Sequence, residues 1–201
     1  MATTNLAQDV LWFWFGDQGH ADVVDKQLQQ RWFVKDPAVD REIETRFAAL
    51  LIPARTGTLG WQVTPRGRLA LILLLDQFSR NIHRGTAEAF AFDPAALTLC
   101  LEGLAVGDDR RCGLFERVFC YLPLEHAEDL GCQGRSVELF RSLQAEAPVA
   151  LRKTFAAFYD YAVRHRDIIA RFGRFPHRNA ILGRPSSAAE LDFLNQPGSS
   201  F

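Results

Sequence analysis

The sequence lacks the motifs that mark several common enzyme classes. It contains no H-E-x-x-H zinc motif, no G-x-S-x-G nucleophile elbow and no glycine-rich phosphate loop. Its four cysteines, Cys100, Cys112, Cys120 and Cys132, include no C-x-x-C pair and no spacing typical of zinc ligands. We therefore predict four free thiols, no bound metal and no cofactor.

Net charge and long apolar runs are also scarce. The formal net charge is −1 at pH 7 and the pI is about 6.5, which gives no overall electrostatic attraction to nucleic acid or to an acidic membrane surface. The apolar residues 10–15 are too few to span a membrane, and no basic segment precedes them as in an export signal. We expect a cytoplasmic protein with neither nucleic acid nor membrane as a partner.

Lysine is rare, because only Lys26, Lys35 and Lys153 occur among the 23 basic residues. The arginine excess has two interpretations. Arginine suits bidentate contacts with carboxylates and phosphates, but a GC-rich genome gives the same bias.

Apolar residues, in contrast, are abundant. They make up 48% of the chain and include 16 Phe and 4 Trp, which is enough to bury a full core. No Gly/Ser/Pro-rich linker divides the chain, and no run alternates between apolar and polar residues over a useful length. The sequence therefore predicts one all-α domain over residues 1–201.

The segment 64–85 is the one around which the other helices are expected to pack. Its residues 69–75 are all apolar, and Leu and Ala dominate them, which favours a buried helix over a buried strand. Thr64 is a suitable N-cap, Pro65 suits the first helical position, and Gly85 is a natural stop. The second half of the segment turns polar through Asp76, Gln77, Arg80, Asn81, His83 and Arg84.

Helical periodicity and cap residues predict the other helices as well. The first is capped by Thr4 or Asn5 and ended by Gly16, and residues 16–35 are expected to be irregular and anchored by Trp32 and Phe33. The later helices are expected after Asp36-Pro37, from Asp93-Pro94 to Gly107, from Leu114 to Leu122, from Pro123 onward, around Val137–Leu143, from Pro148 to Phe172, and after the Ser187/Glu190 capping box.

Two similar segments, LDQFSRN (75–81) and RFPHRN (174–179), carry the candidate binding residues. Arginine and amide groups hold carboxylates and phosphates by charge-assisted hydrogen bonds. The candidates are Arg80, Asn81, Arg84, Arg174, His177, Arg178 and Asn179. The alternatives are a chance similarity in an arginine-rich chain and, for Asp76 with Arg80 at i,i+4, an internal salt bridge between structural residues.

The catalytic candidates are His165, His126, Glu125 and Asp76. His165 is the polar member of an otherwise apolar helical stripe, so it is either a hydrogen-bonded core histidine or, beside a carboxylate, an acid/base group. Glu125 and His126 lie in an acid-rich segment, 125–129, whose spacing fits acids at a helix start better than a metal site.

The segments VLWFWFG (10–16), LDQFSRNIHRG (75–85), YLPLEHAEDL (121–130) and RFGRFPHRN (171–179) together resemble the family known as the domain of unknown function 924. The resemblance covers nearly the whole chain and implies a tetratricopeptide-like array of about eight helices in stacked antiparallel pairs with a concave face, although the 34-residue tetratricopeptide consensus is absent.

Two functions are compatible with these observations. The first is a binding module whose Arg-, Asn- and His-lined groove holds an acidic peptide or a small anion. The second is an enzyme that acts on an anionic small molecule by His/carboxylate acid–base chemistry. In either case we expect anion binding to strengthen as the pH falls through the pKa of His165, near 6.5 if unperturbed.

Overall fold

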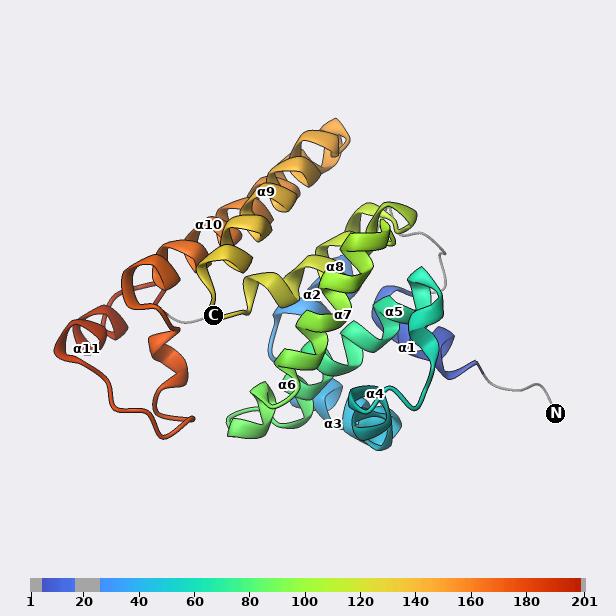
Figure 1. Ribbon diagram of the computed structural model, residues 1–201, viewed down its shortest axis with the longest axis horizontal. Coiled ribbons are helices and arrows are strands. Elements are labelled where there is room, and N and C mark those ends of the chain that lie inside the picture. Colours follow the sequence, from blue (N-terminus) through green and yellow to red (C-terminus); the bar gives the residue numbers. More distant parts are fainter. Residues whose placement is uncertain (1–4, 17–25, 200–201) are drawn as a thin grey trace. The chain divides into compact units, whose positions relative to one another are not determined.

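The computed structural model describes residues 5–16 and 26–199, and within these residues every regular element is a helix (Figure 1). The all-α prediction is therefore confirmed. The cap candidate Thr4 lies outside the described residues. The chain divides into two compact units, unit 1 (Met1–Arg84 and Glu88–Pro123) and unit 2 (Gly85–Ala87 and Leu124–Phe201), which are described separately. A single domain over residues 1–201 stays a prediction.

Both units consist of α-helices and short helical turns. Those up to the end of unit 1 are α1 (Leu6–Phe15), α2 (Lys26–Phe33), α3 (Pro37–Phe47), η1 (Ala48–Leu50), α4 (Leu51–Arg55), η2 (Trp61–Val63), α5 (Pro65–Ile72), the π-helical turn η3 (Leu73–Phe78), α6 (Ser79–Ile82), η4 (Ala87–Phe90), α7 (Asp93–Val106), η5 (Asp109–Arg111) and α8 (Leu114–Glu125). Those that follow are α9 (Leu130–Glu146), η6 (Val149–Leu151), α10 (Arg152–Phe172), η7 (Pro176–Arg178) and α11 (Ala188–Leu194).

The predicted helix starts are confirmed where a side chain caps the first turn. The side chains of Asn5, Asp36 and Thr64 accept hydrogen bonds from backbone N–H groups of α1, α3 and α5. Ser187 and Glu190 form the predicted capping box of α11. These interactions are local in sequence, and each satisfies an N–H group that has no partner within its helix.

Part of the segment expected to be irregular is instead helical. Residues 26–33 form α2, a helix of good helix formers that ends in an aromatic pair; residues 17–25 lie outside the described part of the chain. Trp32 does act as the predicted anchor, because its indole Nε1 donates to the Trp14 carbonyl oxygen at 2.8 Å and its ring lies 4.9 Å from that of Phe119.

One further predicted boundary is wrong. Helix α8 continues through Pro123 to Glu125 instead of ending at Leu122. A side chain of α9 satisfies backbone carbonyl groups at the C-terminal end of α8, because Gln133 Nε2 donates to the carbonyl oxygens of Glu125 at 2.6 Å and Ala127 at 2.8 Å. Helix α7 begins at Asp93 and is followed by Gly107, as predicted.

The segment 64–85 forms one nearly continuous helix, α5–η3–α6, with a π-helical turn in its middle. We call it the central helix. The apolar residues 69–75 are all buried, as predicted. The N–H of Ser79 bonds to the Leu74 carbonyl, and the Ser79 hydroxyl donates to the Leu75 carbonyl at 2.6 Å. A π turn inserts one residue into the hydrogen-bond ladder and is frequent at functional sites. Here it lies where the helix changes from apolar to polar.

Aromatic side chains form the core of unit 1. The ring centroid of Phe78 lies 5.0 Å from that of Phe47 and 5.3 Å from that of Trp14, and the centroids of Phe119 and Trp14 are 5.6 Å apart. The two pairs that involve Trp14 are edge-to-face, a geometry that stabilises the packing beyond the area it buries. This cluster connects α1, α3, the central helix and α8.

Unit 2 is built on the long antiparallel pair α9 and α10, which lie side by side (Figure 1). The stripe predicted for the second of these helices is confirmed at Phe155, Ala162, His165 and Ile169, all of which are buried. A core cluster of unit 2 consists of Ile168, Ile169 and Phe175, and Phe172 and Phe193 pack against it. One antiparallel pair does not establish a tetratricopeptide-like array, which stays a prediction.

One stretch, Ala87–Val106, is long and apolar enough to cross a membrane by length and composition. Core helices of soluble proteins have the same property. Its longer helix, α7, packs against α5 within unit 1.

Candidate functional site

Arg80 is fully engaged by carboxylates of unit 1. Its Nη1 and Nη2 donate to the two carboxylate oxygens of Asp93 at 2.8 and 2.9 Å, and Nη1 also donates to the Asp76 carbonyl oxygen at 2.8 Å. The expected partner, the Asp76 carboxylate, lies farther away at 3.5 Å. Burial lowers the pKa of Arg80, but the charges of Asp76 and Asp93 outweigh burial and raise it. The predicted internal ion pair exists, with Asp93 as its main acceptor.

Asn81 and Arg84 share one carboxylate, that of Asp40 on α3. Arg84 donates to it from Nε and Nη2 at 2.8 and 2.9 Å, and Asn81 donates from Nδ2 at 2.8 Å. Burial raises the pKa of Asp40, but the hydrogen bonds from Arg84 and Asn81 outweigh burial and lower it. Both candidate ligand-binding side chains thus join the central helix to α3.

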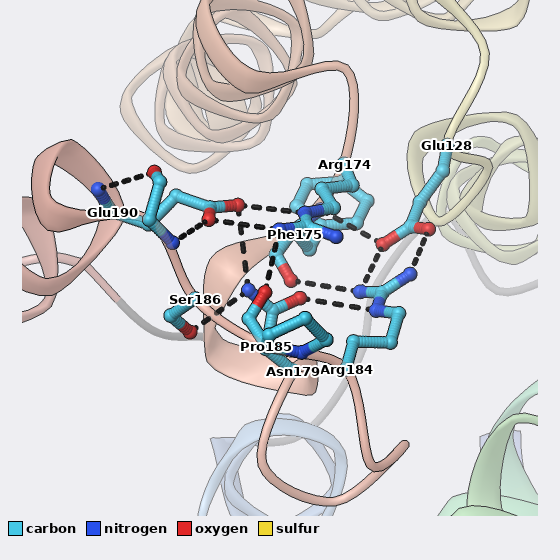
Figure 2. A network of polar contacts seen from close by, with 9 residues as sticks. Glu128, Arg174, Phe175, Asn179, Arg184, Pro185, Ser186 and Glu190 are labelled. Carbon is cyan, nitrogen blue, oxygen red and sulfur yellow. Dashed lines mark hydrogen bonds and ion pairs between the residues drawn. The ribbon is translucent and has the colours of Figure 1, made fainter.

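Glu190 organises the polar side chains of the C-terminal segment in the same way (Figure 2). Arg174 donates to its two carboxylate oxygens at 2.7 and 2.8 Å, and Asn179 Nδ2 donates to it at 3.3 Å and to the Ser186 hydroxyl at 3.0 Å. The bidentate Arg174, followed by the backbone N–H of Ser187, holds the pKa of Glu190 well below its usual range. Arg174 and Asn179 therefore have structural partners.

Glu128 holds a second part of the same segment. Its carboxylate accepts from Arg184 Nη1 and Nη2 at 2.6 and 2.9 Å and from the backbone N–H of Phe175 at 2.8 Å (Figure 2). Arg184 also donates from Nε to the Asn179 amide oxygen at 3.0 Å. One carboxylate at the start of unit 2 thus fixes the loop that carries η7.

We expect Glu128→Gln to loosen residues 174–184. Glutamine offers one uncharged acceptor oxygen in place of two charged ones, so the bidentate ion pair with Arg184 is lost, at an expected cost of about 1 to 3 kcal/mol. The amide protons of Phe175 and its neighbours should exchange faster in hydrogen–deuterium exchange. Glu138→Gln, at an exposed position of α9, is the matched control. Equal exchange in both variants would contradict the role assigned to Glu128.

Glu125 and His165 form a buried pair in unit 2. His165 Nδ1 lies 3.3 Å from the Glu125 carboxylate and 2.9 Å from the Tyr161 carbonyl oxygen. Because a carbonyl oxygen only accepts, Nδ1 carries the proton of the neutral ring, and Nε2 presents the lone pair. The sequence left two alternatives for His165, a core histidine hydrogen-bonded to a neighbour or a histidine beside a carboxylate. In the structure it is both.

The ring of Phe175 brings His165 together with two residues of η7. His165 and His177 have ring centroids 5.5 and 5.6 Å from that of Phe175, and the Arg178 guanidinium lies 4.5 Å over the same ring. His126 lies 6.4 Å from His165 between ring centroids. We call Glu125, His126, His165, His177 and Arg178 the histidine–arginine cluster.

Both buried histidines of this cluster are poor bases. Burial, with further contributions from the charges of His126 and Arg178, lowers the pKa of His165 to about 3. Burial and the charge of Arg178 lower the pKa of His177 to about 4. The pH dependence expected for anion binding therefore moves with the pKa of His165, from near 6.5 to about 3.

The predicted site residues thus fall into two groups. Arg80, Asn81 and Arg84 in unit 1, and Arg174 and Asn179 in unit 2, are bound to carboxylates, and the candidate Asp76 lies beside Arg80. His126, His165, His177 and Arg178 gather with Glu125 in the histidine–arginine cluster. The two similar segments, 75–81 and 174–179, belong to different units, and their convergence on one site stays a prediction.

Apart from Asp76, sequence reasoning did not identify the carboxylates that pair with the arginines. Asp93 was identified only as a helix start, and Asp40 was not singled out. Glu128 was predicted only as one of several acids at a helix start, although Asp129 is the residue that caps α9. Within residues 5–16 and 26–199, no group of three or more His, Cys, Asp or Glu side chains is arranged to hold a metal ion.

Comparison with known proteins gives two matches. Residues 10–198 match the model of a family described as "Bacterial protein of unknown function (DUF924)". A solved structure of a protein of unknown function from Agrobacterium tumefaciens is similar with a TM-score of 0.80 and 38% identity, covering 94% of this chain and 97% of that one. No match was found among the curated proteins.

Proposed function

Since the chain belongs to the DUF924 family of bacterial proteins of unknown function, we propose its function from its own side chains: it binds a small anion at the histidine–arginine cluster. Arg178 supplies the positive charge. His126, His165 and His177 supply ring nitrogens that donate or accept hydrogen bonds. Four free thiols support a reducing, cytoplasmic location for this protein.

The observation that carries this proposal is the position of Arg178. Its side chain is 7% exposed, and its guanidinium stacks on Phe175 next to two neutral imidazoles. A guanidinium in such a low-dielectric environment interacts more strongly with an anion than an exposed one does.

A small anion suits this cluster better than an acidic peptide. Glu125, His165 and Arg178 are all buried, so an occupant must fit within the packed interior of unit 2. A peptide would also bring backbone N–H and C=O groups, which are costly to bury without partners. A sulfate, a phosphate or a small carboxylate presents only acceptors to the Arg178 and imidazole donors.

We expect sulfate to raise the thermal unfolding temperature of the full chain, and Arg178→Gln to weaken this effect. A ligand at 100 times its Kd adds about 2.7 kcal/mol to the free energy of unfolding. A lost charge-assisted hydrogen bond costs about 1.5 to 3 kcal/mol, so the apparent Kd should rise by about 10- to 100-fold. Sulfate is the first probe because it does not titrate between pH 6 and 8; phosphate and carboxylates follow.

Arg141→Gln, at an exposed position of α9, is the matched control and should bind sulfate like the unchanged protein. His165 and His177 should add no pH dependence to the affinity between pH 6 and 8, because both remain neutral there. Sulfate stabilisation that persists undiminished in Arg178→Gln would place the anion elsewhere. No stabilisation by sulfate, phosphate or carboxylates would remove the binding function.

The alternative is an acid–base enzyme that uses His165 with Glu125. The contact of Nδ1 with the carboxylate favours it, since such a carboxylate orients the ring and leaves Nε2 as the base. The low pKa of about 3 opposes it, because efficient general bases have pKa values near the working pH. An NMR titration of His165 distinguishes the two: a pKa between 6 and 7 would favour the enzyme.

A further inference from the structure

A small pocket in unit 1 brings together three of the four cysteines. Cys100 of α7, Cys112 before α8 and Cys120 within α8 all line it, with Arg68 and Asp108 among the other lining residues. Their spacing of 12 and 8 residues matches no thiol motif. The fold alone brings them together, and the pocket lies apart in the chain from the histidine–arginine cluster.

Two of these thiols influence each other within the pocket. Cys112 is the largest cause of the raised pKa of Cys120, and the Cys112 thiol donates a hydrogen bond to the Asp108 carbonyl oxygen at 3.6 Å. Cys112 is half-buried and Cys120 is buried. A small molecule that enters the pocket therefore meets Cys112 more readily.

We propose that Cys112 and Cys120 are a site of oxidation by hydroperoxides and form a disulfide with each other. The Cys112 sulfur attacks the peroxide as the thiolate, so that an S–O bond forms and the O–O bond breaks. The leaving oxygen takes up the Cys112 proton and departs as water from hydrogen peroxide, or as an alcohol from an organic hydroperoxide. The Cys120 sulfur then attacks the Cys112 sulfur. An S–S bond forms, the S–O bond breaks, and the released hydroxide takes up the Cys120 proton and departs as water. The two thiols are oxidised by two electrons and the hydroperoxide is reduced.

The environment assigns the two roles. Cys112 is the attacking residue because it is the more accessible of the pair. The hydrogen bond to Cys112 and burial raise the pKa of Cys120, which keeps Cys120 a thiol until the sulfenic acid has formed next to it. Cys132 lies in unit 2 and does not line the pocket, so it serves as an internal control.

The test is mild oxidation of the folded full chain with hydrogen peroxide. The excess peroxide is removed, the chain is denatured, its free thiols are alkylated, and the digest is analysed by mass spectrometry. We expect the number of alkylated cysteines to fall from four to two, with a linked pair of peptides that contain Cys112 and Cys120. In Cys120→Ser, dimedone should label Cys112 as a sulfenic acid. In Cys132→Ser, the linked pair should form as before.

Four alkylated cysteines after oxidation would overturn the proposal, as would a linked pair that includes Cys100 or Cys132. A linked pair that forms equally fast in urea would also overturn it, because the folded pocket would then have no role. Thermal unfolding of each variant shows whether it is folded, and the peptide map of the unchanged protein tests the proposal without any substitution.

Discussion

Arg80→Met is expected to lower the free energy of unfolding by about 3 to 5 kcal/mol, the range observed when one partner of a buried ion pair is removed. The Asp76 side chain is 1% exposed and that of Asp93 is 19% exposed. Without the guanidinium, two neighbouring carboxylates lose their shared positive charge. The measurement is the urea midpoint and slope for the full chain, compared with the unchanged protein.

The geometry also predicts how this loss can be reversed. Neutralising Asp76 alone, in Asp76→Leu with Arg80→Met, should restore little, because Asp93 is the bidentate acceptor. Asp93→Asn with Arg80→Met should be less destabilised than the sum of the two single changes, which is the signature of direct coupling.

Arg84→Met is the matched control. Arg84 is also bidentate to a carboxylate, that of Asp40, but its side chain is 37% exposed. Its loss should therefore cost at most about 1 kcal/mol. Similar midpoints for Arg80→Met and Arg84→Met would show that the Arg80 pair behaves as a surface pair.

The cap residues and the central helix could be predicted because their signals are local. Asn5, Asp36, Thr64 and Ser187 each bond to a backbone N–H two or three residues away. The apolar run 69–75 is buried because no polar group interrupts it. Helix α2 was missed because only three of its eight residues are apolar, and its Trp32 is held by a contact 18 residues away.

The carboxylate partners could not be predicted, because they are distant in sequence. Arg84 meets Asp40 over 44 residues and Arg184 meets Glu128 over 56. Spacing alone correctly suggested that Asp76 and Arg80 are neighbours, but it could not show that Asp93 would align both its oxygens with the guanidinium. The sequence predicted that arginines would bind carboxylates or other anions, whereas the carboxylate that each arginine binds depends on how the helices pack.

Acid is expected to destabilise the protein through His165, beginning below about pH 6.5. The pKa of this ring is about 3 in the folded protein and about 6.5 in the unfolded chain. Between these values the unfolded chain binds a proton that the folded protein does not, so stability falls as the pH falls. The contribution is absent above pH 6.5, reaches about 2 kcal/mol at pH 5 and approaches about 5 kcal/mol below pH 3.

The His165→Asn variant isolates this contribution, because its amide can donate to the Tyr161 carbonyl oxygen in place of Nδ1 but does not titrate. The variant is expected to be less stable than the unchanged protein at pH 7.5, so the informative quantity is the change in unfolding free energy from pH 7.5 to pH 5. That change should be about 2 kcal/mol smaller in the variant. His177, whose pKa is about 4, acts in the same direction and remains in both proteins, so it cancels in the comparison. Equal losses in the two proteins would mean that His165 takes up its proton while folded, which would return it to the pKa range of a general base and favour the enzyme over the binding protein.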